Sequence, residues 1–290
     1  MSLGVAEKLK VSPKIKSVEV TEDKHIKLKW SKVPLAEKYA VKRATQADGE
    51  FEHLVWVKKC EFTDETAEED TTYWYKITAW KKLEGKKTST KTSGVKACVI
   101  SDISAPDKIS VRSAGKKVAI DLKWKNAKDT DGCTIGRRND FFSQIIPVAK
   151  VNAESFTDEG IVSGQVYHYS LQCFKNGDER ELQGNFSREF HCIHLDSGRV
   201  LEGKASLGRR VRLSLRLVAG ADGYIIERSE SKDGEFTQVG KTKDGFELSF
   251  TDKAPKPLRR YYYRCKAFKV IGDETFESTP SPVKAVKVRF

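Results

Sequence analysis

The stretch that decides the fold reads Tyr73-Trp74-Tyr75-Lys76-Ile77-Thr78-Ala79-Trp80, and the sequence writes it three times. The second copy is Tyr167-His168-Tyr169-Ser170-Leu171-Gln172-Cys173-Phe174, and the third is Tyr261-Tyr262-Tyr263-Arg264-Cys265-Lys266-Ala267-Phe268. Each copy begins 94 residues after the one before it. A Phe-Thr-Asp triplet, ending at Asp64, Asp158 and Asp252, precedes the copies at the same spacing. The chain is therefore predicted to be a threefold repeat.

Upstream of each copy, apolar and polar residues alternate. Ile26-Lys27-Leu28-Lys29-Trp30 places Ile, Leu and Trp on one face, and Ile120-Asp121-Leu122-Lys123-Trp124 repeats it. The third counterpart is Val211-Arg212-Leu213-Ser214-Leu215-Arg216-Leu217, with Leu215 in place of the tryptophan. Alternation with a period of two is typical of a strand that is buried on one face. We therefore expect Trp30 and Trp124 to point into a core.

Each repeat contains seven such short segments, separated by turn residues. A hairpin is expected before the last strand, at Glu84-Gly85-Lys86, Asn176-Gly177-Asp178 and Ile271-Gly272-Asp273, and Asn-Gly is the strongest hairpin signal of the three. No amphipathic helix is apparent. The pattern predicts an all-β protein of three tandem, seven-stranded antiparallel sandwiches. We expect domains at residues 10–102, 103–197 and 198–290.

Over its whole length the chain resembles the fibronectin type III family. The order of its sequence motifs resembles the branch of that family found in bacterial surface and secreted proteins. The resemblance is carried by Trp30, by Trp124 and by the three aromatic strands. It implies an immunoglobulin-like sandwich and a structural tyrosine corner at Tyr73, Tyr167 and Tyr261, where the hydroxyl bonds to upstream backbone. Leu215 and Cys133 depart from the pattern. A fold does not define a function, which must be argued from sites.

Charge is distributed unevenly along the 290 residues, which carry a net charge of +12. Residues 1–101 have a net charge of +5, residues 102–197 of −1, and residues 198–290, with 20 basic and 12 acidic residues, of +8. Positive charge that is confined to the first and third parts of the chain does not indicate a surface that binds nucleic acid along its whole length. The sequence also shows no helix for docking into a groove and no aromatic platform for stacking bases. No apolar run is long enough to span a membrane, and no signal peptide is apparent at the N-terminus.

None of the six cysteines belongs to a C-x-x-C pair, which argues against a zinc or thioredoxin motif. Strand parity places Cys133, Cys173 and Cys265 inward, and we expect them to be reduced, unreactive, buried thiols. Cys133 lies on the strand that neighbours the strand of Cys173 in the fibronectin type III fold. This pair is the one for which a disulfide stays an alternative.

Catalytic and metal-binding patterns are weak. The five histidines do not recur between repeats, and no Gly-x-Ser-x-Gly elbow is present, so we expect no enzyme active site. His191-Cys192-Ile193-His194 offers two ligands on one strand face, fewer than zinc requires. The acidic clusters at residues 64–70 and 129–131 lack the order of a calcium loop. We therefore expect no catalytic residue, metal or cofactor.

Most aromatic residues fall at strand positions that face the core, but Trp56, Trp74, Trp80 and Tyr262 do not. Trp74 and Tyr262 should be partly exposed. Exposed rings can stack on sugars or on a partner protein, but they can also cover a sheet face. We favour the cover.

The strongest candidate site is an anion-binding pole formed by Arg209, Arg210, Arg259 and Arg260. Both pairs precede strands that begin at one end of the fibronectin type III topology, and arginine suits sulfate, phosphate and carboxylate. The alternative interpretations are that these arginines contact a following domain or only keep this end of the chain soluble. We expect a monomeric, non-catalytic spacer, adhesion or interaction module, extracellular or at a cell surface, whose partner is a protein or a polysaccharide. Two alternatives stay open: accessory domains of a larger secreted carbohydrate-active enzyme, and a module that binds an anionic polysaccharide through the third domain.

Overall fold

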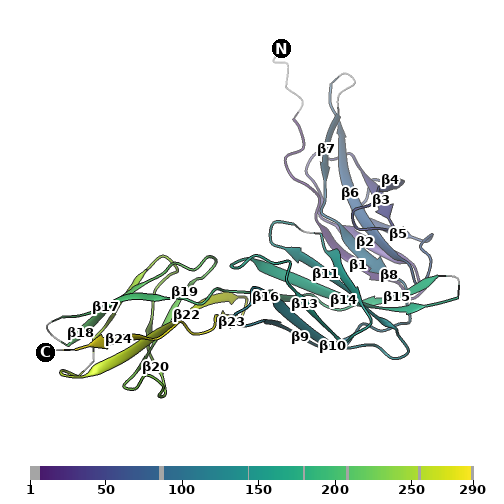
Figure 1. The fold of residues 1–290 in the computed structure, drawn as a ribbon. Helices are drawn as coiled ribbons and strands as arrows, with labels where there is room; N and C mark the ends of the chain where they lie inside the picture. Colours follow the sequence, from purple (N-terminus) through teal and green to yellow (C-terminus); the bar gives the residue numbers. More distant parts are fainter. Residues whose placement is uncertain are drawn as a thin grey trace, which may run out of the picture. The chain divides into compact units, whose positions relative to one another are not determined.

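The computed structural model describes residues 7–84, 88–142, 144–178, 180–206, 209–253 and 256–288. Within these ranges the regular elements are 24 strands, β1 to β24, and no helix occurs (Figure 1). Accordingly, the described part of the chain has no helix that could cross a membrane. The prediction of an all-β fold is confirmed.

The first repeat contains two antiparallel sheets. A three-stranded sheet has the order β1-β2-β5, and a five-stranded sheet has the order β4-β3-β6-β7, with β8 also pairing β6. The strands are β1 (Ile15–Val20), β2 (Ile26–Trp30), β3 (Lys38–Ala44), β4 (Glu52–Val57), β5 (Glu61–Asp64), β6 (Thr72–Lys82), β7 (Thr88–Thr92) and β8 (Lys96–Val99). The aromatic stretch that opens at Tyr73 forms most of β6, the strand that pairs with β3, β7 and β8.

The second and third repeats contain the same pair of sheets. The second has β9 (Asp107–Ser113), β10 (Ile120–Lys125), β11 (Gly132–Asn139), β12 (Ile146–Val151), β13 (Ser155–Asp158), β14 (Val166–Asn176), β15 (Glu181–Phe186) and β16 (Phe190–Ile193). The third has β17 (Val200–Ser206), β18 (Arg210–Leu215), β19 (Gly223–Ser229), β20 (Thr237–Lys241), β21 (Ser249–Asp252), β22 (Arg260–Ile271), β23 (Glu274–Glu277) and β24 (Lys284–Lys287).

The last strand of each repeat is interrupted. β7 and β8 both pair with β6, as β15 and β16 pair with β14, and β23 and β24 with β22. Each pair of segments is therefore one broken strand, and each repeat has seven strands in sequence order. This agrees with the predicted seven-stranded sandwiches of the fibronectin type III kind.

The described residues group into two compact units. One contains the described residues within 7–109, 123–154 and 168–190, and the other contains those within 110–122, 155–167 and 191–288. The boundary between units runs through the second repeat, whereas the sequence repeat suggests three equal parts. The domain limits at 10–102, 103–197 and 198–290 stay predictions.

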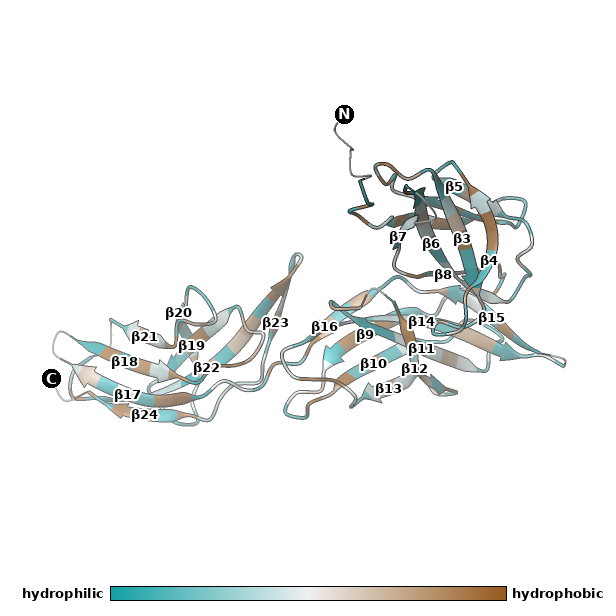
Figure 2. Ribbon diagram, turned by 90° about the horizontal axis from the view of Figure 1, so that it is seen from above, coloured by the Kyte–Doolittle hydropathy of each residue, from teal (hydrophilic) through white to brown (hydrophobic). Residues whose placement is uncertain are grey.

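The cores of the first and third repeats follow from the alternation. Ile26, Leu28 and Trp30 are buried in a cluster with Tyr75 and Ile77 of the facing sheet. The third repeat builds its cluster from the equivalent strands: Val211, Leu213, Leu215, Tyr224, Ile226, Tyr261, Tyr263 and Cys265. Hydrophobic and hydrophilic residues alternate visibly along strands such as β10 (Figure 2). Burial of this apolar surface is the main stabilising contribution in a sandwich without helices.

Individual burial in the second repeat follows the same parity. Trp124 is buried, and Cys133 and Cys173 are fully inaccessible, as predicted. Trp74 and Tyr262 are half-buried, which confirms their outward parity. Trp56 is 44% exposed.

The predicted hairpins at Ile271-Gly272-Asp273 and Asn176-Gly177-Asp178 both form, but the tighter turn is not at the Asn-Gly pair. Ile271 pairs with Glu274 around a two-residue turn in which Gly272 has a φ of 59°, a conformation that glycine adopts at little cost. At the Asn-Gly pair, Asn176 stays in β14 and pairs with Glu181, so the loop is longer. Asn176 is held in the strand because its N–H donates to Asp131 at 2.7 Å. The predicted turn at Glu84-Gly85-Lys86 includes residues outside the described ranges.

Candidate anion-binding site at the end of the third repeat

The four arginines singled out in the sequence flank the starts of two strands. Arg210 is the first residue of β18 and Arg260 the first of β22, and Arg209 and Arg259 come directly before them. All four side chains belong to exposed residues. Arg210 pairs with Ser206 at the end of β17, and Arg260 pairs with Lys287 at the end of β24.

The two arginine pairs lie at the same end of the third repeat. β17 and β24 lie side by side, since a Cβ on Gly203 would come within 2.4 Å of the Val286 side chain. Beyond β24, the N–H of Val288 donates to the carbonyl of Arg259 at 2.8 Å. Figure 1 shows β17, β18 and β24 together near the C-terminal end of the chain. The structure thus brings together the loop before β18 and the loop before β22.

The basic pole is larger than the sequence suggested. We use this name for the exposed cations at this end: Arg209, Arg210, Lys253, Lys256, Arg259, Arg260 and Lys287. Lys253 follows β21, whose last residue Asp252 pairs with Val211 at the start of β18. The three lysines were missed because they occur singly in the sequence, and only strand pairing places them beside the arginines.

Acidic compensation at the basic pole is slight. Arg259 donates through Nη1 to Glu230 at 2.8 Å, and both side chains are about half exposed. Exposed pairs of this kind contribute about 1 kcal/mol or less. The other six cations form no ion pair with any residue in the described ranges. Like charges held this close together repel one another, and a bound anion would relieve that repulsion.

A buried carboxylate directly behind the basic pole does not offset it. Asp252 accepts a hydrogen bond from the Tyr263 hydroxyl at 2.9 Å and one from Arg228 Nη1 at 2.6 Å. Burial, followed by the charge of Asp252, raises the pKa of Tyr263, so the phenol remains a donor. Asp252 is therefore paired with Arg228, which is not a member of the basic pole.

The first repeat contains the same arginine–aspartate–tyrosine contact. Asp64, only 1% exposed, accepts from Tyr75 Oη at 2.7 Å, from Arg43 Nη1 at 2.8 Å and from the Thr66 N–H at 3.0 Å. Burial opposes ionisation of Asp64, but the hydrogen bonds from Tyr75 and Thr66 and the charge of Arg43 outweigh it, and the pKa is lowered. The aspartate of the Phe-Thr-Asp triplet therefore ties one sheet to the other.

The first tyrosine of each copy bonds to the loop that precedes its strand. The hydroxyl oxygens of Tyr73, Tyr167 and Tyr261 accept from backbone N–H groups five residues upstream, at 3.3, 2.9 and 2.8 Å. In the third repeat the donor is Lys256, a member of the basic pole. This bond fixes the loop that carries Lys256 and Arg259.

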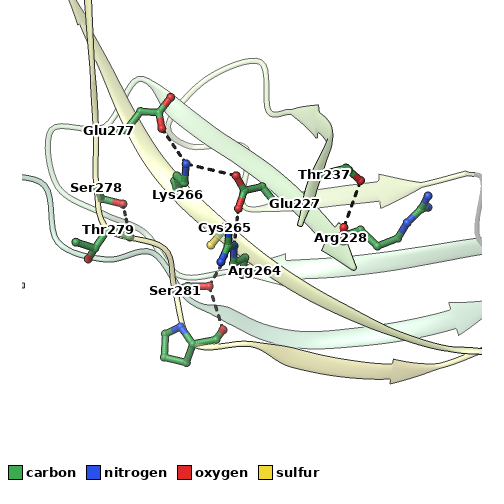
Figure 3. Close-up of polar contacts among 11 residues, drawn as sticks. Glu227, Arg228, Thr237, Arg264, Cys265, Lys266, Glu277, Ser278, Thr279 and Ser281 are labelled. Atoms are coloured by element: carbon green, nitrogen blue, oxygen red, sulfur yellow. Dashed lines mark hydrogen bonds and ion pairs between the residues drawn. The ribbon is translucent and has the colours of Figure 1, made fainter. Parts of the chain in front are cut away.

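A serine that the sequence analysis missed also recurs every 94 residues: Ser93, Ser187 and Ser281. Each lies in the interruption of the last strand and accepts a hydrogen bond through Oγ from a backbone N–H of the aromatic strand. In Figure 3, Ser281 Oγ accepts from Cys265 N at 3.0 Å and donates to the Pro282 carbonyl at 3.1 Å. The hydroxyl replaces the backbone partner that the break removes.

We expect Ser281→Ala to destabilise the third repeat by about 1–3 kcal/mol, because the buried Cys265 N–H loses its acceptor. Chemical denaturation, followed by circular dichroism, measures the change. Thr275→Ala on the neighbouring exposed strand β23 is the control, with an expected effect below about 0.5 kcal/mol. Equal stabilities of the two variants would contradict the role of the hydroxyl.

The outer sheet face of the third repeat is electrically balanced, unlike its basic pole. Glu227 accepts from Arg264 Nε at 2.5 Å, and Lys266 lies 3.4 Å from Glu227 and 3.1 Å from Glu277 (Figure 3). These alternating charges neutralise one another across β19, β22 and β23. Ion pairs of this kind are rare at the basic pole, where Arg259 is the one member that has one with a described residue.

The histidine-containing segment before the third repeat has structural contacts. His194 is 1% exposed, and its Nδ1 lies 2.9 Å from Ser113 Oγ. Burial lowers the pKa of His194, which favours the neutral ring. Within the described ranges, no three His, Cys, Asp or Glu side chains are arranged to hold a metal ion.

A lysine of the first repeat contacts the exposed Trp56 and the half-buried Trp80. Lys38 Nζ lies 4.1 Å from the ring centroid of Trp56 and 4.5 Å from that of Trp80. The two indoles meet edge to face with centroids 6.2 Å apart. Rings at this angle, with a cation between them, do not form a flat surface on which a sugar ring stacks.

No family model matches the chain, and no curated protein matches it. Among solved structures it is similar to the FN1-FN3 domains of chicken CNTN1, with 14% identity, coverage of 96% of this chain and 98% of that chain, and a TM-score of 0.34. It is also similar to a two-domain fibronectin type III segment of chicken tenascin, with 17% identity, coverage of 63% and 99%, and a TM-score of 0.37.

The strand order of each repeat carries the structural assignment. A three-stranded sheet formed by the first, second and fifth strands accompanies a sheet formed by the others, three times over. The chain is therefore a tandem array of fibronectin type III-like sandwiches.

Proposed function

We propose that this chain is a non-catalytic interaction module that binds an anionic polymer through the basic pole of its third repeat. The observation that carries the proposal is the gathering of seven exposed cations, six of them without an ion pair in the described ranges, at one end of a folded repeat. The neighbouring sheet face is neutralised by its own acids, so the charge of the basic pole does not reflect a uniformly basic surface.

The arrangement favours a polymer with repeated sulfate or carboxylate groups over a small anion. The cations come from several separate segments: the loop before β18, the stretch after β21, the loop before β22 and the end of β24. Several anionic groups along one polymer can engage these segments together. Arginine forks bind such groups bidentately, and no enclosed cavity is needed.

An anionic polysaccharide is the partner we propose, and we place the chain outside the cell or on its surface, as a monomer. Its other repeats then serve as spacers that present the basic pole. A role as accessory domains of a secreted carbohydrate-active enzyme is the alternative, since such domains also bind polysaccharides. Neutral sugars are less suited to this chain because Lys38 occupies the space between Trp56 and Trp80.

Chromatography on matched matrices tests the proposal. The chain should be retained on a sulfated polysaccharide matrix at low salt, elute as the salt concentration rises, and pass through the uncharged parent polysaccharide. Screening of exposed charges, whose range falls to about 8 Å at physiological ionic strength, gives the salt dependence. Equal retention on the neutral matrix would contradict the anion requirement.

A further inference from the structure

Cys133 and Cys173 occupy facing positions on neighbouring strands of the second repeat. Counted along the repeats, they replace Tyr39 and Ala79 of the first, which are direct partners between β3 and β6. Their sulfur atoms lie 3.0 Å apart. Both side chains are fully inaccessible to solvent.

The register of this position suits a disulfide. In the third repeat the equivalent partners are Tyr224 and Ala267. The backbone N–H and carbonyl of Tyr224 form hydrogen bonds with Thr242, and those of Ala267 form hydrogen bonds with Ser278. Tyr224 and Ala267 therefore form no backbone hydrogen bond with each other. In such non-hydrogen-bonded antiparallel pairs the Cα atoms lie about 4.5 Å apart, within the range that a disulfide spans.

The cysteine pair also provides a hydrogen-bond acceptor that a tyrosine hydroxyl provides in the other two repeats. In the other repeats a tyrosine hydroxyl accepts from a backbone N–H, that of Val33 or of Val218. In the second repeat the Ala127 N–H donates to Cys173 Sγ at 3.4 Å instead. In the second repeat, Cys173 Sγ is therefore the acceptor in place of the tyrosine hydroxyl of the other two repeats.

The two thiols differ in acidity. The hydrogen bond from Cys133 lowers the pKa of Cys173, whereas that same bond, together with burial, raises the pKa of Cys133. Burial raises the pKa of Cys98 and of Cys265 to about 11. Since the thiolate is the reactive form, these directions favour Cys173 over Cys133 as the attacking thiol.

We propose that Cys133 and Cys173 are a modification site that a low-molecular-weight disulfide converts to an intrachain disulfide. Cys173 thiolate attacks one sulfur of the oxidant and forms a mixed disulfide, and one small thiolate leaves. Cys133 then loses its proton and attacks Cys173 Sγ, and the second small thiolate leaves. The two cysteines together give up two protons and two electrons, and the oxidant becomes two thiols.

Peptide mapping after oxidation tests the assignment. The full chain is incubated with glutathione disulfide, both in the native state and during refolding from denaturant. Remaining thiols are then alkylated in denaturant, and a non-reducing digest is analysed by mass spectrometry. We expect a Cys133–Cys173 cross-link and loss of two of the six free thiols. Formation should be faster during refolding, because the native sulfurs are buried.

Two variants and a stability measurement complete the test. Cys173→Ala should abolish the cross-link, and Cys265→Ala, a buried cysteine elsewhere, should retain it. The melting temperature of the oxidised protein should fall by several degrees on addition of reductant, and that of Cys173→Ala should not change. Six free thiols after both treatments, a stable glutathione adduct at Cys173, or a cross-link through another cysteine would each overturn the proposal.

Discussion

Asp64→Ala is expected to destabilise the first repeat by about 3 kcal/mol. The change leaves the Arg43 guanidinium and the fully buried Tyr75 hydroxyl without their shared acceptor. Removing one partner of a buried charged pair has a cost of this order. Denaturant unfolding followed by tryptophan fluorescence measures it, because four of the five tryptophans lie in this repeat.

The pH dependence of that effect has a defined sign. The pKa of Asp64 is lowered in the folded state, so its stabilising contribution is present above the ordinary aspartate pKa of about 4 and is lost as pH falls through the folded value. The gap in stability between the native chain and Asp64→Asn should therefore be largest near neutral pH and shrink in acid. Asp23→Ala, in an exposed loop, is the control and should change stability little at any pH. A gap that does not vary with pH would contradict the charged role of Asp64.

The fold could be predicted because local pattern and long-range repeat agree. The alternation from Ile26 to Trp30 indicates which face of the strand is buried. The 94-residue spacing indicates that the same sandwich fold occurs three times. The break in the last strand could not be predicted in this way. It depends on a hydroxyl, such as that of Ser281, that substitutes for a backbone partner. Although this serine recurs every 94 residues, a serine gives no sign in the sequence that its side chain accepts a hydrogen bond from a neighbouring strand.

The candidate site could be predicted only in part. Adjacent arginines such as Arg209-Arg210 stand out in the sequence, and strand topology indicates which loops share an end. Lys287 gives no signal, because its place beside Arg260 is set by pairing between β24 and β22. Nor does sequence reveal that Glu230 would take one of the four arginines as its partner. Such contacts depend on loop geometry, which residue patterns do not specify.

Replacing Arg209, Arg210, Arg259 and Arg260 together with Ser should weaken binding to a sulfated polysaccharide by roughly 100-fold or more at low salt. Each exposed charge contributes about 1 kcal/mol at contact distance in water, and four losses combine. The salt dependence of the remaining affinity should also be shallower. Because all four side chains are exposed, the melting temperature should change little.

A charge-matched control distinguishes binding at the basic pole from attraction by the net positive charge of the chain. Lys16, Lys29, Lys32 and Lys58 are exposed cations of the first repeat that form no ion pair with the described residues. Their replacement by Ser lowers the net charge of the chain by the same amount. This variant should keep most of the affinity of the parent chain. Equal losses in the two quadruple variants would mean that net charge alone drives binding.

Arginine footprinting on the unaltered chain tests anion binding at the basic pole most directly. An arginine-specific dicarbonyl reagent is applied with and without a saturating sulfated oligosaccharide, and modified positions are mapped by mass spectrometry. We predict protection of Arg209, Arg210, Arg259 and Arg260, with unchanged labelling of the exposed Arg112 in the second repeat. Protection that is absent from these four positions, or that spreads equally to Arg112, would contradict an anion-binding basic pole.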